Sequence, residues 1–381
     1  MINHFFKINF LTLKSKNMSN SILLEPYKLG SINLKNRMVM APMTRSRSVN
    51  SQHAATELTA RYYEQRATAG LIITEGTFVS TKAVGFINVP AIYNDAQTEG
   101  WKLVTEAVHN KGGKIFAQLW HTGRLSHPDL HNGELPHAPS ALNPFAKAYT
   151  NDGFVDTVVP KEMTIEDINQ TILDFKNGAV NAVKANFDGI ELHAANGYLF
   201  HQFFNGYSNH RTDEYGGSIE NRARILFDIL DALKGVIDYS LVGVRLNPSL
   251  HNAQGMMLDE LTIPTHEYII TRLNDYGLAY VHLTEPYAPV DDVPFAVTEV
   301  AKHFRPFYKG TLIINKSFTK ATGEKVIEDG FADLVAYGVP FLANPDLVKR
   351  FKIDALLNTP DQATFYTSTE KGYIDYPELV G

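Results

Sequence analysis

The sequence predicts a single (β/α)₈ TIM barrel, an α/β fold in which eight parallel strands alternate with helices. Apolar runs of strand length recur eight times along the 381 residues, with helix-like segments between most of them. These runs are almost continuously hydrophobic, which is typical of parallel strands buried on both faces. The length also suits one barrel, because this fold commonly exceeds the size of an ordinary domain. We therefore expect one domain over residues 18–381.

The expected strands are short apolar runs bounded by polar or turn-forming residues. They are Met38–Met43, Leu71–Glu75, Lys114–Trp120, Gly189–His193, Leu241–Leu246, Tyr280–Thr284, Thr311–Asn315 and Leu334–Tyr337. A capping box at Thr164–Asp167 precedes an expected helix Ile168–Lys184, and Ser218 can cap a helix Ile219–Leu233. Barrels of this kind carry their active site at the C-terminal ends of the strands. Polar residues at those ends are therefore the candidate site residues.

Three segments do not belong to a minimal barrel. Within residues 23–36, Leu29–Leu34 is typical of a short hairpin that could cover the floor of the barrel. Residues 121–163 form a long excursion after the third strand, and we expect this segment to be a lid or a wall of the substrate pocket. Residues 1–17 are too short and interrupted to span a bilayer, and no small-residue cleavage site follows them. We interpret them as a disordered extension or a misassigned start before Met18.

Composition excludes several classes of protein. The net charge of −6 argues against nucleic acid or an anionic membrane as the main partner, and 44% hydrophobic residues suit a globular enzyme. The sequence contains no cysteine, which excludes disulfides, thiolate nucleophiles, cysteine-bound zinc and iron–sulfur clusters. We expect a cytoplasmic protein.

Nucleotide-binding motifs of the common kinds are absent. The sequence has neither a Gly-x-Gly-x-x-Gly after a strand nor a Walker loop. In a barrel, a phosphate group usually binds after strands seven and eight. Those positions are occupied here by Asn315, Lys316 and Ser317 and by Gly338 and Val339.

Arg245 lies near the end of the fifth strand, where it is expected to point into the barrel. A buried guanidinium needs an anionic or strongly accepting partner. A cofactor that becomes anionic is one candidate partner, and an internal salt bridge to Glu191 or another strand carboxylate is the alternative. Thr44, Gln118 and Trp120 lie at the ends of other strands.

His193, Asn196 and Tyr198 follow the fourth strand closely. Together they supply two neutral hydrogen-bond donors and one proton donor, a set that suits a polarised oxygen. The alternative is a structural histidine and a helix-capping asparagine. Four histidines between His121 and His137 raise the possibility of zinc, but their spacing matches no common ligand set, and we expect no metal.

Six motifs in this order resemble the Old Yellow Enzyme family of flavin-dependent ene-reductases, classical members of the N-ethylmaleimide reductase type. They are Ala41–Arg45, Tyr62–Ala67, Gln118–Arg124, His193–Leu199, Asn209–Arg222 and Ala343–Leu347, and the resemblance extends from Leu23 to Gly381. It implies an FMN-binding barrel that takes hydride from NADPH or NADH. The hydride then passes to the β-carbon of a small alkene conjugated to a carbonyl or nitro group.

The resemblance also implies roles for individual residues. Thr44 is similar to the residue that bonds the flavin C4 oxygen, and Gln118 and Arg245 to residues at the pyrimidine edge. The further residues that would contact the flavin are Ala41, Pro42, Met43 and Gly76, mainly through the backbone, with Asn315, Lys316, Ser317, Gly338 and Val339 at its phosphate.

On the substrate side, His193 and Asn196 match the pair that binds the activating oxygen, and Tyr198 matches the acid that protonates the α-carbon. Phe86, Trp120 and Tyr366 match aromatic walls of the substrate cleft.

Two departures from the family pattern concern the flavin phosphate. Many members have an arginine where Val339 stands, and glycines where Lys316 and Ser317 stand. We expect Lys316 to compensate. Two other functions remain open: a flavin-free lyase or isomerase using Tyr198 as acid and Lys316 as a phosphate-binding or Schiff-base lysine, and a flavin-binding protein without turnover. We expect a monomer or homodimer.

Overall fold

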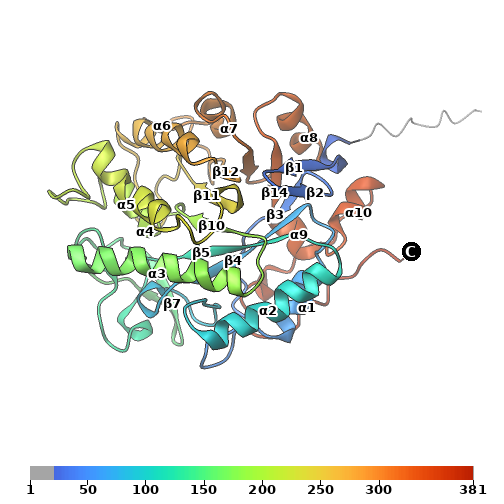
Figure 1. Cartoon of the computed structure of the whole chain (residues 1–381), viewed down its shortest axis with the longest axis horizontal. Helices are drawn as coiled ribbons and strands as arrows, with labels where there is room; N and C mark the ends of the chain where they lie inside the picture. The colour runs from blue at the N-terminus through green and yellow to red at the C-terminus, as the bar shows by residue number, and fades with distance from the viewer. Residues whose placement is uncertain (1–20, 381) are drawn as a thin grey trace, which may run out of the picture.

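Eight parallel strands close into a barrel at the centre of the molecule (Figure 1). The computed structural model describes residues 21–380, so the expectation for residues 1–17 lies outside the described residues. In chain order the barrel strands are β3 (Met38–Met40), β4 (Leu71–Phe78), β5 (Ile115–Trp120), β10 (Gly189–His193), β11 (Val242–Leu246), β12 (Tyr280–Thr284), β13 (Leu312–Asn315) and β14 (Leu334–Tyr337). Strand β14 pairs with β3 and closes the ring. The predicted fold class is confirmed.

Three strands have the predicted bounds, and the largest differences concern β3 and β4. Strand β3 ends at Met40 rather than Met43, and Pro42, which has no N–H for a ladder, follows soon after. Strand β4 extends to Phe78, beyond the predicted end at Glu75. Its register against β5 shifts between Ile73 and Gly76, so the strand resumes pairing after an irregularity that the hydrophobic pattern does not show.

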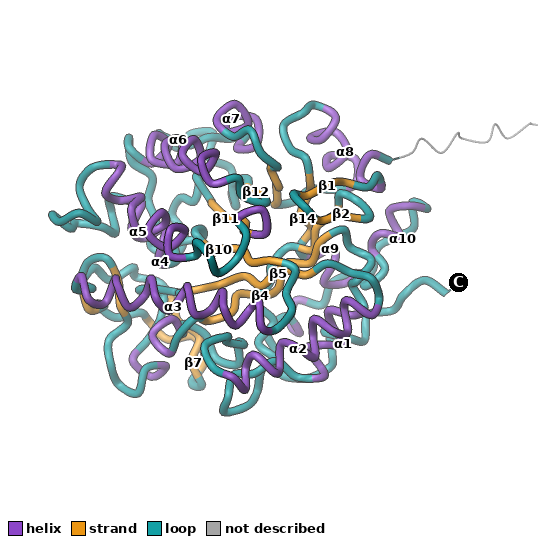
Figure 2. Tube along the Cα trace, viewed as in Figure 1, coloured by secondary structure: helices purple, strands orange, loops and turns teal. Residues whose placement is uncertain are grey.

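Helices surround the barrel (Figure 2). They are α1 (Glu57–Glu64), α2 (Asp95–Asn110), α3 (Ile165–Lys184), α4 (Leu199–Phe204), α5 (Ile219–Ala232), α6 (Thr262–Leu273), α7 (Val300–Phe304), α8 (Lys320–Glu328), α9 (Val339–Ala343) and α10 (Leu347–Lys352). The predicted capping box is present, because the Thr164 side chain accepts from the Asp167 N–H. The helix begins at Ile165, three residues earlier than predicted, since the box forms its first turn. Ser218 caps α5 as predicted.

The predicted N-terminal hairpin is confirmed. Strands β1 (Tyr27–Leu29) and β2 (Ile32–Leu34) pair antiparallel and lie beside β3 and β14 (Figure 1). Leu29 and Leu34 are buried and join the apolar cluster formed by the inner side chains of the barrel strands. A second, larger cluster fills the space between the barrel and the helices. The hairpin therefore extends the inner core of the barrel.

The excursion at 121–163 contains short strands of its own. They are β6 (His137–Ala138), β7 (Lys147–Thr150), β8 (Gly153–Asp156) and β9 (Lys161–Glu162), with a 3-10 turn at Pro128–Leu130. Strands β7 and β8 form a hairpin, and Tyr149 of β7 bridges to Phe86. This hairpin is thus positioned beside a residue expected to line the substrate cleft. Among the described residues, no helix is both long enough and apolar enough to cross a membrane.

Replacing Leu34 by alanine should destabilise the protein, because Leu34 is 1% exposed in the inner core. We expect the free energy of unfolding to fall by about 2–5 kcal/mol. Denaturant titration followed by circular dichroism measures this change. Leu356, which is 90% exposed, provides the matched control, and its replacement by alanine should change the free energy little. Equal stabilities of the two variants would contradict a role of the hairpin in the core.

Candidate active site

A cavity of about 470 Å³ opens at the C-terminal ends of strands β11, β13 and β14 and the segment after β3. Nine of the residues predicted to bind a cofactor line it: Ala41, Pro42, Met43, Arg245, Asn315, Lys316, Ser317, Gly338 and Val339. The closed barrel brings these distant segments together, since β14 lies between β13 and β3. Thr44, Gly76 and Gln118 do not line this cavity; Gly76 and Gln118 are register partners on β4 and β5.

Arg245 is buried, lines this cavity and lacks a full set of partners. Its NH2 donates to the Asn315 side-chain oxygen at 3.2 Å, while its Nε is buried without a partner among the described residues. The alternative salt bridge to Glu191 is not formed as a direct contact among those residues. Because a buried guanidinium needs acceptors, Arg245 keeps donor capacity for a bound group.

Glu191 instead bonds two other side chains inside the barrel. Its Oε1 accepts from Gln118 Nε2 at 2.8 Å, and its Oε2 lies 2.8 Å from His282 Nδ1. Glu191 and His282 are fully buried, and Gln118 is almost so. His282 is not among the predicted site residues, although a polar residue between Val281 and Leu283 of a buried strand is a signal for one.

A second buried carboxylate, that of Glu75, binds the backbone of the loop that carries Thr44. Glu75 Oε2 accepts from the Arg45 backbone N–H at 3.0 Å, and burial raises the pKa of Glu75 to about 7. The next residue, Gly76, packs against the Trp120 ring, and a Cβ there would lie 2.4 Å from a ring carbon. A glycine is therefore required beside this tryptophan. Glu75 was also missed, since its partners are backbone groups far along the chain.

His193 ends strand β10, and its imidazole is neutral. Burial, together with the nearby charge of Arg245, lowers the pKa of His193 well below its ordinary value. Its Nδ1 is buried without a partner among the described residues. The ring is thus available to donate or accept a hydrogen bond without carrying a charge.

Asn196 adopts a left-handed backbone conformation, with φ of +56°, which asparagine tolerates better than most residues. Its Oδ1 accepts from Asn247 Nδ2 at 2.9 Å and from the Tyr287 hydroxyl at 3.1 Å. Since both partners donate to the oxygen, the Nδ2 group stays available as a donor. Asn247 and Tyr287 were not found from the sequence, because each belongs to a loop after a different strand.

Tyr198 lies against the same tryptophan as His193. Its ring meets Trp120 edge-on with centroids 4.8 Å apart, and His193 at 5.0 Å. Burial raises the pKa of Tyr198 above its ordinary value, so the phenol keeps its proton at neutral pH. The structure therefore gathers His193, Tyr198 and Trp120 into one cluster.

One of the expected aromatic walls, Phe86, contacts this cluster. Phe86 stacks on Trp120 with centroids 5.5 Å apart. Tyr366 is 54% exposed and follows Phe365, whose carbonyl accepts from both Arg45 and Arg47. These two buried arginines hold the C-terminal segment at the barrel end, which a local sequence pattern does not reveal.

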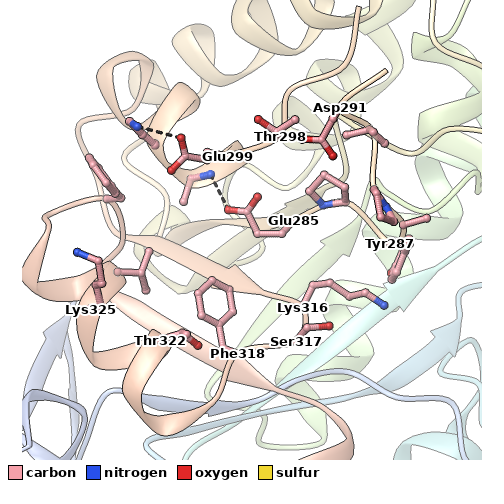
Figure 3. A pocket seen from close by; sticks show the side chains of 18 of the residues that line it. Glu285, Tyr287, Asp291, Thr298, Glu299, Lys316, Ser317, Phe318, Thr322 and Lys325 are labelled. Carbon is pink, nitrogen blue, oxygen red and sulfur yellow. Dashed lines mark hydrogen bonds and ion pairs between the residues drawn. The ribbon is translucent and has the colours of Figure 1, made fainter. Parts of the chain in front are cut away.

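A larger cavity of about 580 Å³ adjoins the first one (Figure 3). Lys316 and Tyr287 line both cavities, and Lys316 Nζ lies 4.4 Å from the centre of the Tyr287 ring. Two acidic side chains that line this larger cavity bind neighbouring groups: Glu285 accepts from the Val300 and Ala301 N–H groups, and Glu299 pairs with Lys302 (Figure 3).

The histidines of the excursion do not form a metal site within residues 21–380. His131 Nε2 bonds the Ser126 hydroxyl at 2.9 Å, and burial lowers the pKa of His121 to about 3 and that of His131 to about 4. These rings are therefore buried and neutral.

Comparison with known proteins gives consistent results over nearly the whole chain. Residues 22–358 match the NADH:flavin oxidoreductase / NADH oxidase family. A protein of Oryza sativa subsp. japonica named 12-oxophytodienoate reductase 1 is 42% identical over 366 residues, covering 94% of this chain and 93% of that protein.

Solved structures are similar to the same extent. Morphinone reductase in complex with tetrahydroNAD is 42% identical with a TM-score of 0.87, covering 94% of this chain and 98% of the other. An old yellow enzyme homologue from Zymomonas mobilis is 39% identical with a TM-score of 0.88, covering 94% and 99%. A flavin-free lyase or isomerase is therefore not favoured. The chain belongs to the NADH:flavin oxidoreductase / NADH oxidase family, which includes the Old Yellow Enzymes, and is an FMN-dependent oxidoreductase that uses a reduced nicotinamide nucleotide.

Proposed function

We propose that this chain reduces carbon–carbon double bonds conjugated to a carbonyl or nitro group, with FMN bound by one barrel domain over residues 18–381. The observation that carries this proposal is the cluster of His193 and Tyr198 around Trp120, with Asn196 three residues beyond His193. This cluster combines neutral donors with a protonated phenol. Two similar proteins are named 12-oxophytodienoate reductase and morphinone reductase. These names support oxo compounds as the substrate class.

The residues of the smaller cavity fit FMN. Arg245 has a buried Nε without a partner among the described residues, as expected beside a group that gains negative charge. Gln118 and Thr44 would bind the pyrimidine side, with Ala41, Pro42, Met43 and Gly76 contacting the rings. Asn315, Lys316, Ser317, Gly338 and Val339 would lie at the phosphate. When bound, FMN supplies the hydride that it has taken from NADPH or NADH.

His193 and Asn196 bind the activating oxygen of the substrate. As hydride reaches the β-carbon, negative charge develops on this oxygen, and hydrogen bonds to it become stronger. Asn247 and Tyr287 hold the Asn196 oxygen, so the Nδ2 donor faces away from them. Both oxygen-binding groups are neutral and need no counter-ion when the site is empty of substrate.

Tyr198 then protonates the α-carbon. Burial raises the pKa of this phenol, so the proton is present at neutral pH. The aromatic rings of Trp120, Phe86 and Tyr366 provide flat walls for a planar conjugated ligand. The proton lost by Tyr198 is replaced from solvent after each turnover.

The last part of the proposal concerns partners, cellular location and oligomeric state. We propose that the partners are small molecules only, without nucleic acid or membrane, and that the protein acts in the cytoplasm as a monomer or homodimer. The net charge of −6 supports the exclusion of nucleic acid.

Replacing Tyr198 by phenylalanine should separate the two half-reactions. Reduction of the flavin by NADPH should be unchanged, because this step needs no acid. Reduction of cyclohexenone should slow by about 10²- to 10⁴-fold, while nitroalkenes should be less affected. Anaerobic stopped-flow absorbance measures both steps. Equal losses in both half-reactions would reject the role of Tyr198 as acid.

The rate of alkene reduction should depend little on pH, because neither His193 nor Tyr198 changes its protonation state near neutral pH. His193 stays neutral above its lowered pKa, and Tyr198 stays protonated below its raised pKa. Between about pH 6 and pH 9 we expect the oxidative rate constant to vary by less than about twofold. Stopped-flow measurements across this range test the expectation. A sigmoidal change centred near the ordinary pKa of histidine would show that His193 titrates during the reaction.

Replacing Lys316 by alanine should weaken FMN binding. Lys316 is half-buried at the cavity, and Val339, where many relatives have arginine, supplies no charge. Loss of a charged hydrogen bond should lower the affinity by about 10- to 100-fold. Quenching of flavin fluorescence during reconstitution measures it. Lys325, which pairs with Asp329, provides the control, and its replacement by alanine should leave FMN affinity unchanged. Wild-type FMN affinity in the Lys316→Ala variant would refute the placement of Lys316 at the phosphate.

A further inference from the structure

Glu191 is a buried carboxylate that the proposed reaction does not use. It lies on β10 between two strands that carry expected flavin contacts, and its side chain is fully buried. Glu191 is the register partner of Gln118 on β5 and of Gly243 on β11, two residues before Arg245. A carboxylate in such a position needs an explanation, because burying a charge is costly unless it is well paired.

The surroundings of Glu191 keep it ionised. Burial alone would raise its pKa, but the combined effect of His282, Arg245 and Gln118 outweighs burial and lowers the pKa. Burial, with a smaller effect of the Arg245 charge, lowers the pKa of His282 although Glu191 acts to raise it, so the imidazole is neutral at pH 7. The pair therefore carries one negative charge inside the barrel.

An ionised carboxylate can only accept hydrogen bonds, and this fixes the orientation of Gln118. The contact of 2.8 Å between Glu191 Oε1 and Gln118 must be donated by the amide nitrogen. The Gln118 carbonyl oxygen is then available as an acceptor. The pyrimidine ring of a flavin has an N–H between two carbonyl groups, and a fixed acceptor would suit it.

The same negative charge offsets Arg245. The guanidinium of Arg245 does not contact Glu191 directly, yet the two charges share a closed, buried space where electrostatic interactions are weakly screened. A full positive charge beside FMN would favour its reduced form, which carries more negative charge. A negative charge behind the guanidinium weakens that preference.

We propose that Glu191 is a positioning residue that orients Gln118 and, by offsetting Arg245, lowers the redox potential of bound FMN. This inference rests on the proposed placement of Gln118 and Arg245 at the flavin. A lower potential makes the reduced cofactor a stronger hydride donor toward the alkene.

The test is the midpoint potential of the purified FMN-bound protein, measured by dye equilibration under anaerobic conditions. Glu191→Gln preserves the shape of the side chain and removes the charge. We expect the ratio of affinities for reduced over oxidised FMN to rise at least tenfold, which is about 30 mV more positive for a two-electron couple. His282→Gln keeps a neutral donor and should leave the potential unchanged.

An FMN-bound Glu191→Gln protein with the wild-type potential would overturn the proposal and leave Glu191 with a structural role. If that variant does not fold with FMN, Glu191→Asp decides, because the shorter side chain displaces the negative charge as well as withdrawing the carboxylate from Gln118. A smaller positive shift supports the proposal, and an unchanged potential overturns it.

Two further measurements separate this inference from the proposed function. Arg245→Gln should lower the potential; if it does not, the placement of Arg245 at the flavin has failed. Reoxidation of the reduced wild-type protein by cyclohexenone tests the proposed reaction independently of any potential.

Discussion

The site depends on one constraint: the interior of a closed barrel is dry, so polar side chains that enter it must satisfy one another. Glu191 is satisfied by Gln118 and His282, and Arg245 only in part by Asn315. Arg245, which lines the cavity, keeps a buried Nε without a partner among the described residues. A bound group completes the set, which explains how a stable barrel can also be a binding site.

Left-handed backbone conformations after the strand ends also shape the site. Asn196 takes a left-handed conformation that turns the chain directly after His193. Lys316 and Ser317 have φ of +100° and +60°, in a region that glycine occupies easily and other residues at a cost of about 1–3 kcal/mol. The chain instead has a lysine there, which places a cation at the cavity where Val339 provides none.

The loops after the strands complete the site by reaching across the barrel mouth. Tyr287, after β12, donates to Asn196, after β10, and its ring lies beside Lys316, after β13. Three loops are thereby linked around one cavity. In the segment after β3, Arg45 and Arg47 bind the carbonyl group of Phe365 and so position the neighbouring Tyr366.

Much of the fold could be predicted from the sequence, because buried parallel strands have a continuous hydrophobic pattern and capping residues act locally. The eight strands, the hairpin and the caps at Thr164 and Ser218 follow from such patterns. His193, Asn196 and Tyr198 are close in sequence, so their grouping was also predictable. The partners of Asn196, the role of Glu75 and the Glu191–His282 pair were decided only by the tertiary structure. Barrel closure brings together strands that are far apart in the chain, and no local pattern encodes which buried polar groups then meet.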